Sequence, residues 1–304
     1  MLHWATGRVG GAEGQDVADE GEPVTAPVLW IGGPPGAGKT TVARVLARRH
    51  GLRLYQADVH TWEHRDRALA AGHAAAARWE RLPPGRRWSL PPHEMLAMSL
   101  HHERGAMIAD DLRALPAAPL TVAEGTPVTP AVAGAGDRAV WLLPTPDVQR
   151  ARLAERGIAP GVTALYTLLL EEIGAQVAES GARVLPVDGT RSVPDTVAEL
   201  EKLFADALAA GPVARSAAER ARLLRHANRA VVRQYAAYFA RPWTSGDPAT
   251  TVRPFACECG RADCASQVPL ALADFPDPPG SRTPGSDEPA SPPVLAPGHP
   301  SPAG

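Results

Sequence analysis

The sequence predicts an α/β fold in which helices cover both faces of a parallel β-sheet. Short apolar runs that end in glycine or an acidic residue recur between residues 27 and 187. Segments with helical periodicity separate these runs, and a glycine-rich turn joins the first run to the first helix. Because neighbouring parallel strands need crossover connections, this alternation of strands and helices implies a parallel sheet with right-handed crossovers.

Five segments are typical of buried strands. Each is a short, largely apolar run, as expected where both faces of a parallel sheet are covered. The first is PVLWIG, and its glycines lead directly into the turn. The expected strands are residues 27–32, 52–57, 120–123, 138–143 and 183–187.

Helices are expected in the intervening segments. The first spans residues 40–50, where Val42, Val45 and Leu46 form an apolar stripe and Gly51 provides the stop. The others are expected over residues 63–80, 92–115, 146–156, 162–179 and 194–210. Beyond Gly211-Pro212 the pattern changes, and the capping box Ser216–Glu219 begins a helix that extends to about residue 240.

The expected domain organisation follows from these shifts. Residues 1–25 are rich in glycine and acids, and residues 275–304 are rich in proline, serine and glycine, so both ends are expected to be disordered. Residues 26–210 form the α/β domain. Residues 211–274 form a helix followed by a loop-rich module that contains all the cysteines.

Composition limits the possible classes of protein. Charged residues make up 21% and hydrophobic residues 44%, which is typical of a soluble globular chain. The formal net charge of −2 gives no strong field for nucleic acid or an anionic membrane, and no apolar run approaches a membrane span of roughly 20 residues. The acidic N-terminus lacks the features of a signal or transit peptide, so a cytoplasmic location is expected.

The glycine-rich turn carries the most specific signal. Gly33-Pro-Pro-Gly-Ala-Gly-Lys-Thr40 matches the pattern G-x-x-x-x-G-K-[ST], and it has a strand before it and a helix after it. Glycines let successive backbone N–H groups point at an anion, and the helix N-terminus adds its positive dipole end. Lys39 would reach the β- and γ-phosphates, and the Thr40 hydroxyl would bind Mg²⁺. We therefore expect nucleotide binding here.

With this loop, the chain resembles the small P-loop kinases, such as adenylate, shikimate and gluconate kinase, over residues 27–210. The resemblance implies a three-layer sandwich with strand order 2-3-1-4-5, and ATP and Mg²⁺ as cofactors. It also implies that Gly189, after the last strand, receives the adenine. The expected nucleotide-binding residues are Gly33, Pro34, Pro35, Gly36, Ala37, Gly38, Lys39, Thr40, Thr41 and Gly189.

The resemblance assigns roles to two acids at strand ends. Asp58 follows the second strand, where the acid would orient or deprotonate the acceptor hydroxyl; the alternative is a helix cap. Glu124 follows the third strand, where the acid would support Mg²⁺ together with Thr40; the alternative is a turn acid. Glutamate at this place departs from the aspartate of nucleotide kinases.

Arginines and aromatic residues are further candidates. Arg152 and Arg156 lie four residues apart on the helix after the fourth strand and resemble the arginines that embrace the phosphates; the alternative is a solvated basic face. The same resemblance places the substrate-binding helices in a region that contains further candidates. These residues either line an acceptor pocket or belong to a solvent-exposed helix face and the core: His101, His102, Trp62, Trp79 and Trp88.

The cysteine cluster predicts a possible zinc site. Cys257, Cys259 and Cys264 are spaced closely enough to bind one Zn²⁺, but a structural site needs a fourth ligand. Asp263, His226 or a more distant residue could supply it. The alternative is three reduced thiols in a packed turn, and the odd number argues against a disulfide framework.

The predicted function is therefore ATP-dependent phosphoryl transfer to a small molecule, catalysed by Lys39, Asp58, Arg152 and Arg156. Two other functions remain open: an ATPase that acts on a partner, and a nucleotide-binding regulator that contacts a protein or nucleic acid through the C-terminal region. The arginine-rich helix 216–240 gives the nucleic-acid alternative some electrostatic basis, but the sequence shows no recognised nucleic-acid-binding fold.

Overall fold

The computed structural model describes residues 27–277 and 291–302. A five-stranded parallel sheet has the order β2-β3-β1-β4-β5, which confirms the predicted fold class and strand order. The strands are β1 (Val28–Gly32), β2 (Arg53–Gln56), β3 (Thr121–Glu124), β4 (Ala139–Pro144) and β5 (Val184–Val187). Because all five strands run in parallel, the carboxyl ends of β1, β2 and β3 lie side by side at one end of the sheet, and the candidate site forms there.

Two hydrophobic cores cover the two faces of the sheet. Leu29 and Ile31 of β1 face helices α1 (Lys39–His50) and α10 (Val193–Leu203). Val28 and Trp30 point the other way, toward α5 (Pro92–Ser99), α6 (Arg104–Arg113) and α9 (Pro160–Ser180). The alternation of side chains along a strand thus explains why the apolar run of β1 serves both cores.

Several predicted helices are divided in the structure. The predicted helix over residues 63–80 is divided between α2 (Thr61–Ala70) and α3 (Ala74–Arg81), with a break at Gly72, whose φ is +76°. The short η1 (Ala57–His60) precedes α2. The segment 92–115 forms α5 and α6, separated at Leu100, which has a φ of +60°. Only a few residues tolerate this left-handed conformation, so each break ends a helix sharply. The remaining helices are α4 (Pro84–Arg87), α7 (Pro130–Ala133), α8 (Pro146–Glu155) and α11 (Ala205–Ala210).

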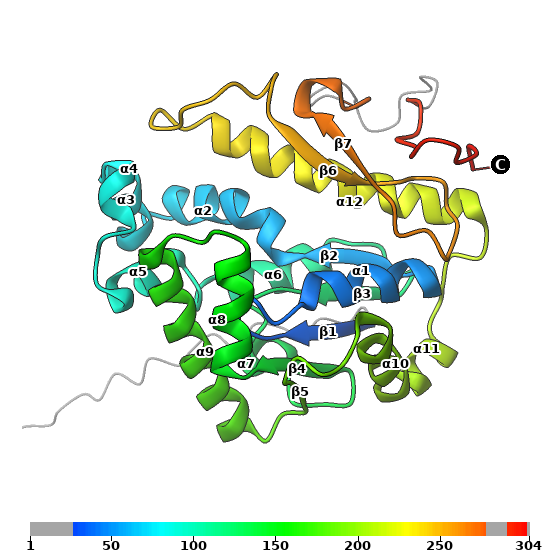
Figure 1. The fold of residues 1–304 in the computed structure, drawn as a ribbon, viewed down its shortest axis with the longest axis horizontal. Helices are drawn as coiled ribbons and strands as arrows, with labels where there is room; N and C mark the ends of the chain where they lie inside the picture. Colours follow the sequence, from blue (N-terminus) through cyan, green and yellow to red (C-terminus); the bar gives the residue numbers. More distant parts are fainter. Residues whose placement is uncertain (1–26, 278–290, 303–304) are drawn as a thin grey trace, which may run out of the picture.

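The C-terminal part packs along the β2 edge of the sheet (Figure 1). Helix α12 (Ala217–Phe239) begins at the Ser216–Glu219 capping box and contacts β2, η1 and α2. The antiparallel hairpin of β6 (Val252–Ala256) and β7 (Gln267–Ala271) lies on α12, and η2 (Leu272–Asp274) follows it. Figure 1 shows the hairpin beside α12, and the loop between β6 and β7 reaches α1, where Arg48 contacts it.

The prediction of a disordered tail from residue 275 is wrong for two segments. Phe275 is 2% exposed and packs against Phe255 with the rings tilted at 33°, so it belongs to the core of the C-terminal module. Val294 is buried in the same core, and its backbone pairs with Glu258. The proline-rich composition of this region did not indicate that Phe275 and Val294 would be buried. Disorder is also expected for residues 1–25 and for the rest of the tail. Residues 1–25, 278–290 and 303–304 lie outside the described residues, whereas segment 291–302 is described.

Candidate active site

The phosphate loop, residues 33–40, connects β1 to α1 in a tightly curled conformation. Gly33 has a φ of +131°, and a Cβ atom at this position would lie 2.3 Å from the carbonyl oxygen of Leu142. Gly38 is the N-cap of α1 and has a φ of +93°. A residue with a side chain fits neither position without strain, so backbone geometry requires glycine at both.

Lys39 is 5% exposed and lies folded along its own loop. Its Nζ donates a hydrogen bond to the carbonyl of Pro34 at 2.9 Å. Burial lowers the pKa of Lys39, while the charges of Asp58 and Glu124 oppose this shift. The ammonium group is thus held among acids and backbone dipoles, close to where an incoming phosphate would exchange for the Pro34 carbonyl.

Glu124 and Thr40 form a set of oxygen ligands that suits Mg²⁺. The Thr40 hydroxyl donates to Glu124 Oε1 at 2.9 Å, and Gln56 Nε2 donates to the same oxygen at 3.1 Å. The other oxygen, Oε2, is buried and has no hydrogen-bond partner within the described chain. Burial and the nearby charge of Asp58 raise the pKa of Glu124. A fully buried carboxylate with a free oxygen beside a threonine hydroxyl fits a hard cation that prefers oxygen ligands.

Asp58 lies on η1, immediately after β2, and its side chain is exposed to a cavity of about 600 Å³. Lys39 and Thr40 line the same cavity. The backbone carbonyl of Asp58 accepts hydrogen bonds from Thr61 Oγ1 at 2.8 Å and from Gln234 Nε2 at 3.1 Å. These contacts fix the backbone of Asp58, and its carboxylate lies close enough to Lys39 for its charge to oppose the lowering of the Lys39 pKa.

The two predicted arginines lie at the end of α8, beside the phosphate loop. Arg152 Nη1 donates to the carbonyl of Gly36 at 3.0 Å. Arg156 is the exposed C-cap of α8 and lines the 600 Å³ cavity and also a second cavity. By contrast, Arg150 pairs with Asp147 on the solvent side. The structure thus brings Arg152 and Arg156 to the loop, and Arg150 points away from it.

The second cavity, of about 270 Å³, lies on the other side of the phosphate loop. Gly38, Thr41 and Gly189 contribute to its lining, together with Arg152 and Arg156. Gly189 has a φ of +86° and follows Asp188, whose carboxylate accepts hydrogen bonds from the backbone and hydroxyl of Thr190. This is the place predicted for the base of the nucleotide.

Gln149 is a site residue that the sequence did not reveal. It is 2% exposed, and its Nε2 donates to the carbonyls of Pro35 at 2.9 Å and Tyr166 at 3.0 Å. The side chain thereby ties the phosphate loop to α9. A glutamine on a helix carries no pattern that distinguishes it from a surface residue, so only the fold exposes this role.

The 600 Å³ cavity has a cationic end that sequence analysis also missed. Arg65 is 3% exposed and stacks over Trp79 at 5.0 Å; its Nε and Nη1 have no partner within residues 27–277 and 291–302. Arg104 is buried beside it, and its guanidinium donates to the carbonyl of Ala57. Burial, together with the charges of His102 and Arg104, lowers the pKa of His101 to about 4, so His101 is neutral at pH 7.

Aromatic rings complete the wall of this cavity. Trp62, Trp79 and Trp88 all line it, and Trp79 and Trp88 meet edge to face at 5.0 Å. All three tryptophans thus bound the cavity, and Trp79 is at the same time a buried residue. His101 also lines it, whereas His102 is exposed and pairs with Glu172.

The arginines of α12 are mostly paired within the chain. Arg225 and Arg229 contact Glu258 and Asp277, and Arg233 pairs with Glu63. Internal pairing of these charges weakens the electrostatic basis for nucleic-acid binding. Separately, no helix in the described segments is both long and apolar enough to cross a bilayer.

No family model matches the sequence, and no curated protein matches it. Among solved structures, the chain is similar to a shikimate kinase from Acinetobacter baumannii in complex with shikimate, at 18% identity and a TM-score of 0.37 over 60% of this chain and 96% of that one. It is also similar to a shikimate kinase from Bacteroides thetaiotaomicron, at 17% identity and a TM-score of 0.34 over 60% of this chain and 99% of that one. A third similar structure is an unliganded sugar kinase from Janibacter sp. HTCC2649, at 18% identity and a TM-score of 0.34 over 60% of this chain and 97% of that one.

The chain has the P-loop kinase fold. The sheet order β2-β3-β1-β4-β5 and the phosphate loop between β1 and α1 establish this from the chain itself. Likenesses at such low identity and TM-score carry no information about the substrate. Chemistry must therefore be argued from the residues around the phosphate loop.

Proposed function

We propose that the protein transfers the γ-phosphoryl group of ATP to a hydroxyl of a small anionic acceptor. One observation supports this most strongly: Lys39, Thr40 and Asp58 line a single cavity that continues to the buried cation Arg65. Nucleotide phosphates and an acceptor would thus meet in one cavity. Holding both reactants in one site favours transfer to the bound acceptor, because phosphoryl transfer depends mainly on positioning and charge stabilisation.

The nucleotide would lie across the phosphate loop. Backbone N–H groups at the start of α1 and the Lys39 ammonium would bind the β- and γ-phosphates. Thr40 and Glu124 would hold Mg²⁺, which supplies charge neutralisation at the phosphates. Arg152 and Arg156 flank the loop and would balance the charge that develops on the transferred group.

The acceptor would occupy the part of the cavity beyond Asp58. The Asp58 carboxylate would accept a hydrogen bond from the acceptor hydroxyl and take its proton. The unpartnered guanidinium atoms of Arg65 would bind a carboxylate or phosphate of the acceptor, since arginine binds such groups in a bidentate manner. The rings of Trp79 and Trp88 would pack on its carbon skeleton.

A titration of ATP in the presence of Mg²⁺ tests the first part of this proposal. We expect the wild-type protein to bind the nucleotide and Lys39→Ala to lose most of that affinity. Arg81→Ala, a change of an exposed cation outside both cavities, is the matched control. Equal affinity in the wild type and Lys39→Ala would contradict the placement of the phosphates.

A screen of hydroxylated carboxylates and sugar phosphates tests the second part. An acceptor should stimulate ATP consumption by the wild type, and Arg65→Met should raise the KM for that acceptor without changing the affinity for ATP. Neutral acceptors that work as well as anionic ones would contradict the assigned role of Arg65. Stimulation by a protein or nucleic acid alone would instead favour an ATPase or regulator.

A further inference from the structure

We propose that Cys257, Cys259, Cys264 and His299 bind one Zn²⁺ ion, which anchors segment 291–302 to the C-terminal module. The three sulfurs and one imidazole nitrogen all lie within 4.8 Å of one another. The cysteines are unpaired and buried, and the histidine is partly buried. This site is separate from the proposed kinase chemistry and does not rest on it.

The distances fit tetrahedral coordination. With Zn–S and Zn–N bonds of about 2.3 and 2.0–2.1 Å, a sulfur and a nitrogen on one tetrahedral ion lie about 3.5–3.6 Å apart. His299 Nδ1 lies 3.3 Å from Cys257 Sγ and 3.6 Å from Cys264 Sγ. His299 therefore occupies the position of the missing fourth ligand.

The other candidates for this position are engaged elsewhere. Asp263 forms an ion pair with Arg261 at 2.8 Å. His226 lies on α12, where it lines a cavity with Tyr55 and His60. The fourth ligand thus comes from the segment that the sequence suggested to be disordered, which explains why the spacing of the cysteines alone did not reveal it.

Local backbone geometry presents the ligands toward one point. Cys257 follows β6, and its N–H donates to Ser266 at 3.1 Å, which closes the loop that carries all three cysteines. Gly260 has a φ of +70° and packs so closely on Ala217 that a Cβ atom would lie 2.1 Å from the Ala217 carbonyl oxygen. The loop is therefore fixed in position against the start of α12.

A turn delivers His299. Its N–H donates to the carbonyl of Ala296 at 3.1 Å, with Pro297 and Gly298 between them, and Gly298 has a φ of +78°. Proline at the second position and a positive-φ glycine at the third are typical of a type II turn. The sequence Ala-Pro-Gly-His thus encodes the geometry that places the imidazole.

Charges and hydrogen bonds around the sulfurs suit a bound ion. Three thiolates and one Zn²⁺ carry a net charge of −1, and Arg48 of α1 provides a positive charge with Nη1 4.0 Å from Cys259 Sγ. The N–H of Ala296 donates to Cys257 Sγ at 3.3 Å. Such hydrogen bonds to ligating sulfurs are typical of the surroundings of metal thiolates.

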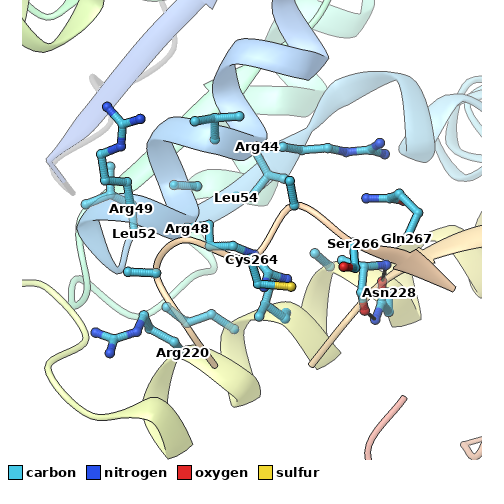
Figure 2. A pocket seen from close by; sticks show the side chains of 18 of the residues that line it. Arg44, Arg48, Arg49, Leu52, Leu54, Arg220, Asn228, Cys264, Ser266 and Gln267 are labelled. Carbon is cyan, nitrogen blue, oxygen red and sulfur yellow. Dashed lines mark hydrogen bonds between the residues drawn. The ribbon is translucent and has the colours of Figure 1, made fainter. Parts of the chain in front are cut away.

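Arg48 also connects this site to the phosphate-loop helix. Its guanidinium donates to the carbonyls of Cys257 and Arg261, so the cysteine loop rests on α1. Figure 2 shows Arg48 reaching from α1 to the loop of Cys264 and Ser266, with Arg220 and Asn228 on α12 beyond it. A cavity of about 630 Å³ lies beside this contact. Bound zinc would therefore stabilise the docking of the C-terminal module on the α/β domain.

The metal content of the full-length, untagged protein tests the proposal. We expect one zinc per chain after purification. Replacement by Co²⁺ should give the intense visible bands of a tetrahedral thiolate complex and a sulfur-to-cobalt charge-transfer band. A purified protein that holds no zinc, takes up none when Zn²⁺ is added and shows no such cobalt bands would overturn the proposal.

Variants of His299 test the fourth ligand. His299→Ala should weaken zinc binding by more than the roughly 10–100-fold that loss of an outer-shell partner costs. His299→Cys should restore it, because four cysteines also make a structural site. His93→Ala, an exposed histidine on α5, is the matched control. Unchanged zinc affinity in His299→Ala would show that this residue is not a ligand.

Protection of the C-terminal segment provides a readout that does not depend on metal affinity. Zinc-loaded wild type should resist proteolysis within residues 291–302, whereas chelated protein and His299→Ala should be cut there. Equal cleavage with and without zinc would contradict the anchoring role. Affinity for ATP in His299→Cys should match that of the wild type, so a failure of the proposed kinase activity would leave this test intact.

Discussion

Replacing Glu124 by glutamine should separate stability from metal binding. Glutamine has nearly the same volume and keeps the oxygen that accepts hydrogen bonds from Thr40 at 2.9 Å and Gln56 at 3.1 Å. These two contacts, worth about 1 kcal/mol each, are therefore retained. Only the buried charge is lost.

The sign of the effect on stability follows from the pKa shift. Burial raises the pKa of Glu124 above its unfolded value, so the folded state binds this proton more tightly than the unfolded state does. The free energy of unfolding then falls as pH rises from about 4.5 through the folded pKa, and at pH 7 the wild type carries this penalty. We expect Glu124→Gln to be at least as stable as the wild type at pH 7, with the difference shrinking toward pH 4.

Metal-dependent function should change in the opposite direction. Charge stabilisation by a metal ion contributes several kcal/mol. Loss of about 3–4 kcal/mol corresponds to a roughly 10²–10³-fold decrease in turnover. The same variant should bind ATP with little dependence on Mg²⁺, which can be measured before the acceptor is known.

The assays are urea denaturation at pH 4 and 7, and ATP titration with and without Mg²⁺. Glu171→Gln, an exposed acid on α9, is the matched control. A Glu124→Gln protein whose ATP affinity keeps the full Mg²⁺ dependence would refute the metal role. A variant destabilised by more than about 2 kcal/mol at pH 7 would refute the stability argument.

Three further changes test other parts of the structure. The pKa of His101 is about 4 in the folded state and 6.5 in the unfolded state, so protons favour the unfolded state and the free energy of unfolding should fall by about 2 kcal/mol between pH 7 and pH 5. In urea denaturation, His101→Asn should reduce this dependence of stability on pH. Gln234→Leu removes the hydrogen bonds that Gln234 makes to the backbone carbonyl of Asp58 and the backbone N–H of Trp62. It should raise the acceptor KM while ATP affinity stays constant, as steady-state kinetics would show. Arg225→Leu leaves Glu258 buried without its partner and should destabilise the C-terminal module by about 3–5 kcal/mol in thermal denaturation; a change below 1 kcal/mol would contradict this estimate.

The α/β domain could be predicted because its signals are local. The strands are continuous apolar runs, and the phosphate loop is a fixed spacing of glycines, Lys39 and Thr40. Acids at the ends of parallel strands necessarily gather at one edge, so Asp58 and Glu124 could be placed near the loop from the sequence. The breaks at Gly72 and Leu100 were less visible, because helix periodicity continues on both sides of each break.

The missed residues depend on long-range contacts. Arg65 and Arg104 look like ordinary helix-surface cations until the fold places them against the acceptor cavity. Gln149 gains its role only from the carbonyls of Pro35 and Tyr166. His299 is separated from the cysteines by a proline-rich stretch, and composition gave no indication that the chain returns to them.

The fate of the γ-phosphoryl group tests the central proposal most directly. The purified protein, Mg²⁺ and ATP labelled in that group would be incubated with a pool of hydroxylated anionic metabolites. We expect the label in a new phosphorylated small molecule with the wild type, and none there with Lys39→Ala or Asp58→Asn. Label that appears only as inorganic phosphate, at a rate that no metabolite changes, would contradict phosphoryl transfer to a small acceptor.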